Sequence, residues 1–299
     1  MRSVRPTHRK VDFLISLSEA LGSQAGFAAG KLGISEGIYL SHNTIRPQLK
    51  NEQQHKAFDL LLRVHASRQS GIFPDTAEFI QEFAGDYMDS FKNLDYLAVQ
   101  GNPLQYSLVA QLGPHVRSIP IDDLEPDRSL PYDPNECWLP LLSGKHVLII
   151  SSIASLLAER AEASLFESVW EKVGIPWFNP ASVESLDFPQ IYDRETRSLY
   201  PTVRDLLENI LNQIDEREFD IALIAGGGIG VPIAACIKRK GRTAISLGGH
   251  LQILFGVQGK RWLDNPEWQE KYVTGAWMKT PEWARPVSEN GLPDDGAYW

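Results

Sequence analysis

The chain has 299 residues, of which 43% are hydrophobic and 22% are charged, with 29 Lys and Arg residues against 38 Asp and Glu residues. This composition excludes an intrinsically disordered chain, because the apolar side chains are numerous enough to form a large core. The net charge of -9 argues against a protein that binds long nucleic acids, since that function needs clustered basic side chains.

The N-terminal segment, residues 1–26, is basic and then weakly apolar. Asp12 and Glu19 interrupt any signal-peptide core, so we expect a surface helix there. No stretch approaches the roughly 18 apolar residues that span a bilayer. Two cysteines, Cys137 and Cys236, are too few for a disulfide framework. We therefore expect a cytoplasmic protein, and a peripheral position at a membrane surface also fits these features.

Four segments repeat one plan, in which a short apolar run is followed by a turn of small residues and then by helical spacing. Such repeats predict crossover connections and a parallel sheet. The runs are almost continuously apolar, which is typical of strands that are covered on both faces. We therefore predict an α/β fold with a doubly wound, mainly parallel, Rossmann-like sheet. The predicted strands are residues 94–100, 146–151, 219–225 and 243–247.

The segments between these strands divide into helices and loops. Residues 45–92 are predicted to be helical around a break at 71–75, and residues 201–216 form an amphipathic helix with a single apolar stripe. Residues 120–143 contain five prolines, which predicts a loop that crosses between the two halves of the sheet. Residues 176–200 are predicted to be another loop.

The C-terminal part differs in composition, because five of the eight tryptophans lie in the last 38 residues. We expect residues 1–262 to form one α/β domain with a helical N-terminal segment. We expect residues 263–299 to form a Trp- and Pro-rich extension that packs on this domain. Two interpretations of its rings stay open: they anchor the extension to the core, or some of them line a sugar or nucleotide pocket.

A first glycine-rich turn follows the predicted strand 219–225. In open parallel sheets, ligands bind at the carboxyl ends of strands, and glycines let the backbone and the following helix N-terminus approach a phosphate. The alternative is a tight turn without a ligand. The sequence lacks both the P-loop pattern and the dinucleotide fingerprint, in which a third glycine would replace Val231. The candidate phosphate-binding residues of this turn are Gly226, Gly227, Gly228 and Gly230.

A second turn, Gly248 and Gly249, follows the next predicted strand and precedes His250. Lys260 and Arg261 lie a few residues further on, and no acidic residue occurs from 222 to 263. We therefore predict a locally positive crevice that holds a diphosphate. His250 is either a general base or a helix-start histidine that bonds the backbone. The sequence contains no metal-ligand motif of the H-x-x-x-H or C-x-x-C type, and we predict no metal site.

Residues 220–262 read DIALIAGGGIGVPIAACIKRKGRTAISLGGHLQILFGVQGKRW. This stretch resembles a bacterial family with a GT-D-type glycosyltransferase fold, whose members belong to polysaccharide biosynthesis. The shared pattern is a strand, a glycine-rich turn, a helix, LGG and then QxLFGxxGKRW. A looser resemblance includes SGIFPDTAEFIQEF, GKHVLIIS, and the WARP and AYW segments of the C-terminal part, so that it covers about two thirds of the chain.

The resemblance implies a nucleotide-sugar-dependent glycosyltransferase that transfers a hexosyl group in polysaccharide or glycan biosynthesis. The implied donor is a UDP-sugar, whose diphosphate would lie at the two glycine turns with Lys260 and Arg261. The implied acceptor is a glycan or a lipid-linked molecule. The alternative is a non-catalytic GT-D-like protein that binds a ligand or acts as an adaptor.

The chain departs from the family at two motifs. The D-x-E metal motif is replaced by residues 250–254, HLQIL, which have no carboxylate for Mn²⁺, so we expect no required cofactor. The arginine-led G-D-G-E motif corresponds to residues 31–37, KLGISEG, where Glu36 matches and Ile34 replaces the aspartate. The resemblance implies that Glu36 is the catalytic base or an acceptor ligand, and the alternative is a surface-turn glutamate.

Overall fold

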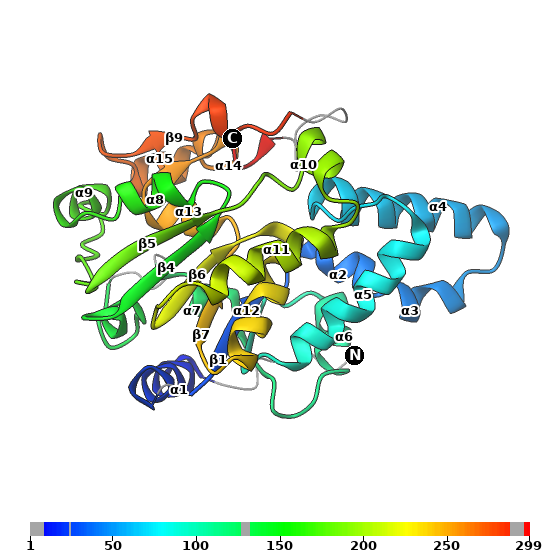
Figure 1. Cartoon of the computed structure of the whole chain (residues 1–299), viewed down its shortest axis with the longest axis horizontal. Coiled ribbons are helices and arrows are strands. Elements are labelled where there is room, and N and C mark those ends of the chain that lie inside the picture. Colours follow the sequence, from blue (N-terminus) through cyan, green and yellow to red (C-terminus); the bar gives the residue numbers. More distant parts are fainter. Residues whose placement is uncertain (1–8, 24, 127–131, 288–295) are drawn as a thin grey trace.

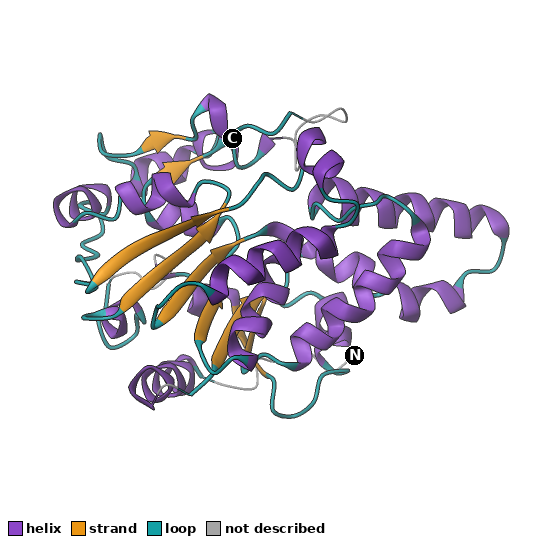
Figure 2. Cartoon of the chain, in the orientation of Figure 1, coloured by secondary structure: helices purple, strands orange, loops and turns teal. Residues whose placement is uncertain are grey.

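The computed structural model of the chain describes residues 9–23, 25–126, 132–287 and 296–299, which form an α/β structure around one large sheet (Figures 1 and 2). The strands of this sheet are β1 (Phe27–Lys31), β2 (Tyr96–Val99), β3 (Arg117–Pro120), β4 (His146–Ser151), β5 (Ser182–Asp187), β6 (Ile221–Ala225) and β7 (Thr243–Ser246). Their order is β3-β2-β1-β7-β6-β4-β5, and every pair of neighbours is parallel. The predicted doubly wound parallel sheet is therefore confirmed.

Helices cover both faces of the sheet (Figure 2). Residues that alternate along each strand contribute to opposite layers: Ile149 and Leu223 belong to the core on one face, and Leu148 and Ile224 to the core on the other. The first face is covered by α1 (Lys10–Ser23), α8 (Ala154–Glu159), α9 (Ala163–Val169) and α13 (His250–Leu254). The second face is covered by α2 (Ile34–Leu40), α4 (Glu52–Arg63), α5 (Ala77–Lys92), α11 (Val203–Asp215) and α12 (Gly230–Arg239).

The shorter elements connect these layers. A π-helical turn, Val64–Gln69, follows α4 directly, and a 3-10 turn, Gly227–Ile229, precedes α12. The remaining helices are α3 (His42–Ile45), α6 (Pro103–Val109), α7 (Ile121–Leu124), α10 (Arg194–Leu199), α14 (Lys260–Leu263) and α15 (Pro266–Tyr272). Two short parallel strands, β8 (Val257–Gln258) and β9 (Met278–Lys279), form a separate pair. In the part of the chain that the structure describes, no helix combines the length and the apolar composition needed to cross a membrane.

The direction in which successive strands are added to the sheet changes between β4 and β6. From β4 the chain passes through α8 and α9 to β5 at the edge, whereas from β6 it passes through α12 to β7 on the opposite side. Helices α8 and α12 accordingly belong to the cores on opposite faces. In open parallel sheets such a switch point leaves a crevice outside the carboxyl ends of the two strands.

Three strands of the large sheet, β1, β3 and β5, and the short pair β8 and β9 lie outside the predicted ones. The loop predicted for residues 176–200 is wrong in part, because it contains β5 and α10, and the loop predicted for 120–143 contains α7 and a 3-10 turn, Leu139–Leu142. Strand β5 reads SVESLD and lies at a sheet edge, so polar side chains interrupt its apolar pattern. Strand β1 reads FAAGK, whose small residues have low strand propensity although all but the last are buried. Strand β3, the other edge, has only four residues.

The C-terminal aromatic residues pack against the first face of the sheet. Trp277 lies edge-on to Trp170, with ring centroids 5.3 Å apart, and Trp268 lies 4.2 Å from Tyr272. Trp268 and Trp277 are both buried, whereas the Trp283 side chain is 67% exposed. Two of the C-terminal tryptophans therefore anchor this part of the chain to the core.

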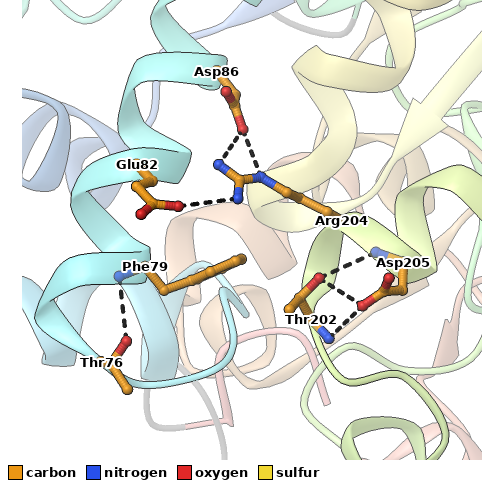
Figure 3. A network of polar contacts seen from close by, with 7 residues as sticks. All are labelled: Thr76, Phe79, Glu82, Asp86, Thr202, Arg204 and Asp205. Carbon is orange, nitrogen blue, oxygen red and sulfur yellow. Dashed lines mark hydrogen bonds and ion pairs between the residues drawn. The ribbon is translucent and has the colours of Figure 1, made fainter.

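Figure 3 shows the polar contacts that join α5 to α11. The Arg204 guanidinium donates to Asp86 Oδ2 at 2.7 Å and to Glu82 Oε2 at 3.3 Å, and it lies 5.1 Å from the centroid of the Phe79 ring. Each helix begins at a capping threonine, Thr76 for α5 and Thr202 for α11. These contacts lie at the surface, and the buried side chains beneath them supply most of the packing.

We expect Arg204→Met to lower the free energy of unfolding by less than about 1 kcal/mol, because exposed ion pairs are screened by water. Phe83→Ala, which empties a fully buried position on α5, the helix that Arg204 contacts, should cost about 3–5 kcal/mol. Urea denaturation of both variants measures the two values. A loss above about 2 kcal/mol in the Arg204 variant would contradict the ranking.

Candidate functional site

A cavity of about 670 Å³ opens at the carboxyl ends of the strands. Each of the seven strands leads into a residue that lines it, so segments far apart in the sequence meet there. In strand order from β1 to β7 these residues include Lys31, Gln100, Asp122, Ser152, Gln190, Gly226 and Gly248. The cavity includes the switch point between β4 and β6, where a crevice is expected.

The two glycine turns reach this cavity in part. Gly226, Gly227, Gly248 and Gly249 line it, whereas Gly228 and Gly230 do not. The Gly228 N–H donates to the backbone oxygen of Ser70 at 2.8 Å, and the Gly248 N–H donates to the backbone oxygen of Ile224 at 3.2 Å. These two N–H groups already have partners, which differs from the expectation that the turns offer free donors to a phosphate.

Lys260 and Arg261, the predicted basic pair, are the first two residues of α14. Arg261 lines the cavity, whereas exposed Lys260 is not among the lining residues. The Arg261 guanidinium carbon lies 4.9 Å from the centroid of the Tyr298 ring, and Nη1 donates to the Tyr298 hydroxyl at 3.2 Å. Tyr298 therefore holds the basic group of this wall in place.

Residues 296–299 are fixed by hydrogen bonds to the polypeptide around α14 and β9. The N–H of Lys260 donates to the backbone oxygen of Trp299 at 3.1 Å, and the Thr280 hydroxyl donates to that of Tyr298 at 2.7 Å. The Trp299 indole N–H donates to the backbone oxygen of Ala284 at 2.7 Å. Trp262, Tyr298 and Trp299 line the cavity, and Trp262 belongs to the buried core as well. A sugar or nucleotide as the ligand of these rings stays a prediction.

Two glycines make room for this segment. A Cβ at Gly249 would lie 2.0 Å from Cε1 of Tyr298, and one at Gly259 would lie 2.2 Å from its carbonyl carbon. Contacts this short force the neighbouring group to move. Gly249 therefore has a steric role in the site, in addition to the role predicted for it in phosphate binding.

Glu36 also lines the cavity, near the start of α2. Its Oε1 accepts a hydrogen bond from the Ser70 hydroxyl at 2.8 Å. Its Oε2 lies 2.0 Å from the place that a Cβ of Gly33, the N-cap residue of α2, would occupy. Burial raises the pKa of Tyr87 well above its ordinary value, and the nearby charge of Glu36 raises it further, so this phenol stays neutral.

The π-helical turn supplies further polar groups beside Glu36. The Ser35 hydroxyl donates to Gln69 Oε1 at 2.6 Å, and His65 Nδ1 lies 3.3 Å from the same hydroxyl oxygen. All three residues line the cavity. Burial lowers the pKa of His65. The sequence analysis missed them because no local motif marks these residues, although π-helical turns often occur at functional sites.

Charged side chains also gather in the lining of the cavity. Lys31 Nζ donates to Glu125 Oε1 at 2.8 Å, and His250 Nδ1 lies 3.3 Å from the same oxygen. With Glu36 and Asp122, Glu125 brings three carboxylates to a cavity that has two strong bases, Lys31 and Arg261. The prediction of a positive crevice without acids is therefore wrong, because acids from the N-terminal half fold against residues 222–263.

Within residues 9–23, 25–126, 132–287 and 296–299, no group of three or more His, Cys, Asp or Glu side chains is placed to hold a metal ion. Helix α13, which stands where the resembled family has its D-x-E motif, contains no carboxylate.

Comparisons with known proteins add little to this geometry. No family model matches the chain, and no curated protein matches it. One solved structure that is similar is described as "Selenomethionine substituted structure of domain of unknown function 1792 (DUF1792)". The two share 12% sequence identity, with a TM-score of 0.43 over 79% of this chain and 77% of that chain.

Gly249→Ala should displace Tyr298 and lower the free energy of unfolding by about 1–3 kcal/mol, because the new Cβ collides with the ring. Gly275→Ala is the matched control, since a Cβ there meets nothing within 4 Å. Urea denaturation, with limited proteolysis near the C-terminus, distinguishes the two. Equal stability of both variants would mean that Tyr298 is not held against Gly249.

The lowered pKa of His65 predicts a dependence of stability on pH. Its ordinary value is 6.5, so below that pH the unfolded chain binds a proton that the folded chain resists. The free energy of unfolding should therefore fall as the pH drops below 6.5 and level off below the lowered pKa. His65→Gln should lose less stability than wild type between about pH 7.5 and about pH 5.5, and an unchanged slope would contradict this assignment.

Proposed function

We propose that this chain binds a nucleotide sugar in the cavity and transfers its sugar to an acceptor hydroxyl in glycan or polysaccharide biosynthesis. The observation that carries the proposal is a cavity at the carboxyl ends of a parallel sheet whose lining combines two chemically different groups of residues. Residues of α14 and the C-terminal segment supply aromatic rings and a guanidinium, which we call the aromatic wall; residues of α2 and the π-helical turn supply hydroxyl, carboxylate, imidazole and amide groups, which we call the polar wall. The cavity volume of about 670 Å³ lies within the usual range for small-molecule sites.

The aromatic wall suits the nucleotide. Trp262, Tyr298 and Trp299 offer ring faces and edges on which a base can stack. Arg261 is held over the Tyr298 ring and can form charge-assisted hydrogen bonds to a diphosphate. Because Lys260 lies outside the cavity, we assign the diphosphate contact to Arg261.

The polar wall suits sugar hydroxyls, which both donate and accept hydrogen bonds. Ser35, Glu36, His65 and Gln69 present a hydroxyl, a carboxylate, an imidazole and an amide within a short stretch of the cavity. In the proposed reaction the acceptor oxygen bonds to the anomeric carbon of the donor. The bond from that carbon to the diphosphate oxygen breaks, and the acceptor proton passes to a base. Arg261 would stabilise the charge on the leaving diphosphate.

A second candidate is a non-catalytic protein that binds a nucleotide sugar or a glycan, or acts as an adaptor. The three carboxylates of the cavity favour it, because they offset the positive potential that a diphosphate leaving group needs. It shares the binding step with the first candidate and differs in having no turnover.

Thermal unfolding with a panel of UDP-, GDP-, TDP- and CMP-sugars, each with and without Mn²⁺, tests both candidates. We expect at least one donor to raise the melting temperature, because a ligand that binds only the folded chain stabilises it. Release of the nucleoside diphosphate, or of CMP from a CMP-sugar, with an acceptor present would indicate a transferase. Binding without release would indicate the second candidate. No stabilisation by any donor would refute the transferase and the nucleotide-sugar form of the second candidate.

Arg261→Met should weaken the binding of that donor by about 10- to 100-fold, because it removes a charged hydrogen-bond donor to phosphate. Lys260→Met is the matched control, since it removes a neighbouring charge outside the cavity and should change affinity less than about threefold. Isothermal titration calorimetry measures both. Equal losses would mean that the effect is a general one of net charge.

A further inference from the structure

Helix α4 carries apolar side chains on two faces, whereas a surface helix normally has one apolar face. Phe58 and Leu62 are buried in the core on the second face of the sheet. Leu60 and Leu61, in contrast, are 63% and 43% exposed. They belong to four apolar residues with the spacing i, i+3, i+4 and i+7, which places their side chains in one row along the helix. This row, which we call the α4 stripe, consists of Ala57, Leu60, Leu61 and Val64.

Basic side chains border the α4 stripe. Lys56 and Arg63 are the i−4 and i+3 neighbours of Leu60, and Arg68 follows in the π-helical turn. All three basic residues are exposed. Lys56 pairs with Glu52 at 2.7 Å, but the two side chains are 75% and 81% exposed, so the ammonium stays accessible. Residues 46–68 contain five Lys and Arg residues and two Asp and Glu residues, so this segment is positive in a chain whose net charge is -9.

Another basic stretch, residues 238–242, differs from this one. It reads KRKGR and contains no apolar side chain. Lys238 pairs with Asp95 at 2.8 Å. Lys240 pairs with Asp215. Its charges are therefore partly used within the fold, whereas the segment around α4 combines exposed apolar and basic groups.

We propose that the α4 stripe and its basic border dock on the surface of a bilayer that contains anionic lipids. Leu60 and Leu61 enter the boundary between headgroups and acyl chains, and the basic side chains contact the lipid phosphates. In Figure 1, α4 projects from the sheet at one end of the molecule, which leaves it accessible to a flat surface.

Charge favours this occupant over a second copy of the chain. A symmetric dimer through α4 would place the same positive segment against itself, and like charges across an interface are unfavourable. An anionic bilayer accepts the apolar and the basic side chains together. Because the rest of the chain is acidic, repulsion from the same lipids would turn the other surfaces away.

Docking through α4 would bring the polar wall of the cavity near the membrane. The π-helical turn continues α4 without a break, and His65 and Gln69 of this turn line the cavity. Ile34 also lines it and is 57% exposed. An acceptor held in the same lipid surface could therefore reach the polar wall. This last step rests on the proposed function, whereas the docking does not.

Sedimentation of the full chain with sucrose-loaded vesicles tests the docking without any donor. We expect binding to vesicles of phosphatidylglycerol and phosphatidylcholine, and binding at least about tenfold weaker to phosphatidylcholine alone. The affinity for the anionic vesicles should fall as the salt concentration rises, because salt screens exposed charges. Equal binding to both vesicles, or binding to neither, would overturn the proposal.

Leu60→Gln with Leu61→Gln should weaken binding to the anionic vesicles by about tenfold or more, because apolar contacts with the lipid are lost. The melting temperature should stay close to that of wild type, since both side chains are exposed. Val11→Gln with Ile15→Gln is the matched control, because these side chains of α1 are 44% and 51% exposed. Equal losses in the two double variants would overturn the proposal.

Arg63→Gln with Arg68→Gln should weaken the same binding by about 10- to 30-fold, because both basic side chains face anionic lipid. Arg239→Gln with Lys240→Gln, which removes the same charge from exposed positions on another helix and its end, should change it less than about threefold. Equal losses would mean that only net charge matters and would overturn the proposal.

Sedimentation equilibrium without lipid tests the other occupant. We expect no dimer that depends on Leu60 and Leu61. A dimer that Leu60→Gln with Leu61→Gln abolishes would mean that a second copy covers the α4 stripe, and it would overturn the proposal. Since no nucleotide sugar is used in these measurements, their outcome is independent of the proposed transfer reaction.

Discussion

The parallel hydrogen bonding of the sheet is the constraint on which the rest of the structure depends. Seven strands that run in one direction place all their carboxyl ends at one edge. Both faces must be covered by apolar helices, because neither face is polar enough to meet water. Polar side chains from distant segments can then gather at that edge. Lys31, the last residue of β1, and His250, the first residue of α13, meet there at Glu125.

The sequence predicts those parts of the fold and site that carry a local signal. Strands β4, β6 and β7 are nearly continuous apolar runs, and the glycine turns directly follow β6 and β7. Strands β1 and β5 lack that signal, since one is built of small residues and the other is a polar edge strand. Glu125 and Tyr298 could not be found, because their roles come only from contacts with residues more than 30 positions away.

The number of acidic residues in one stretch of the sequence does not predict the charge of the cavity. Residues 222–263 contain none, yet Glu36, Asp122 and Glu125 reach the same space from the first half of the chain. Burying Glu125 beside Lys31 costs desolvation energy that an apolar pair would avoid, so this pair adds little to stability. Its effect is instead to hold an ammonium and a carboxylate together in the lining of the cavity.

The wall formed by residues 296–299 has a consequence for the order in which the molecule is assembled. Every strand of the large sheet precedes Ser246 in the chain, whereas Tyr298 and Trp299 follow it by about fifty residues. During synthesis the sheet and its helices can therefore fold before the aromatic wall emerges from the ribosome. Until Tyr298 reaches Gly249 and Arg261, the crevice stays open on that side. In the order of synthesis, the cavity wall at Tyr298 is therefore completed after the sheet.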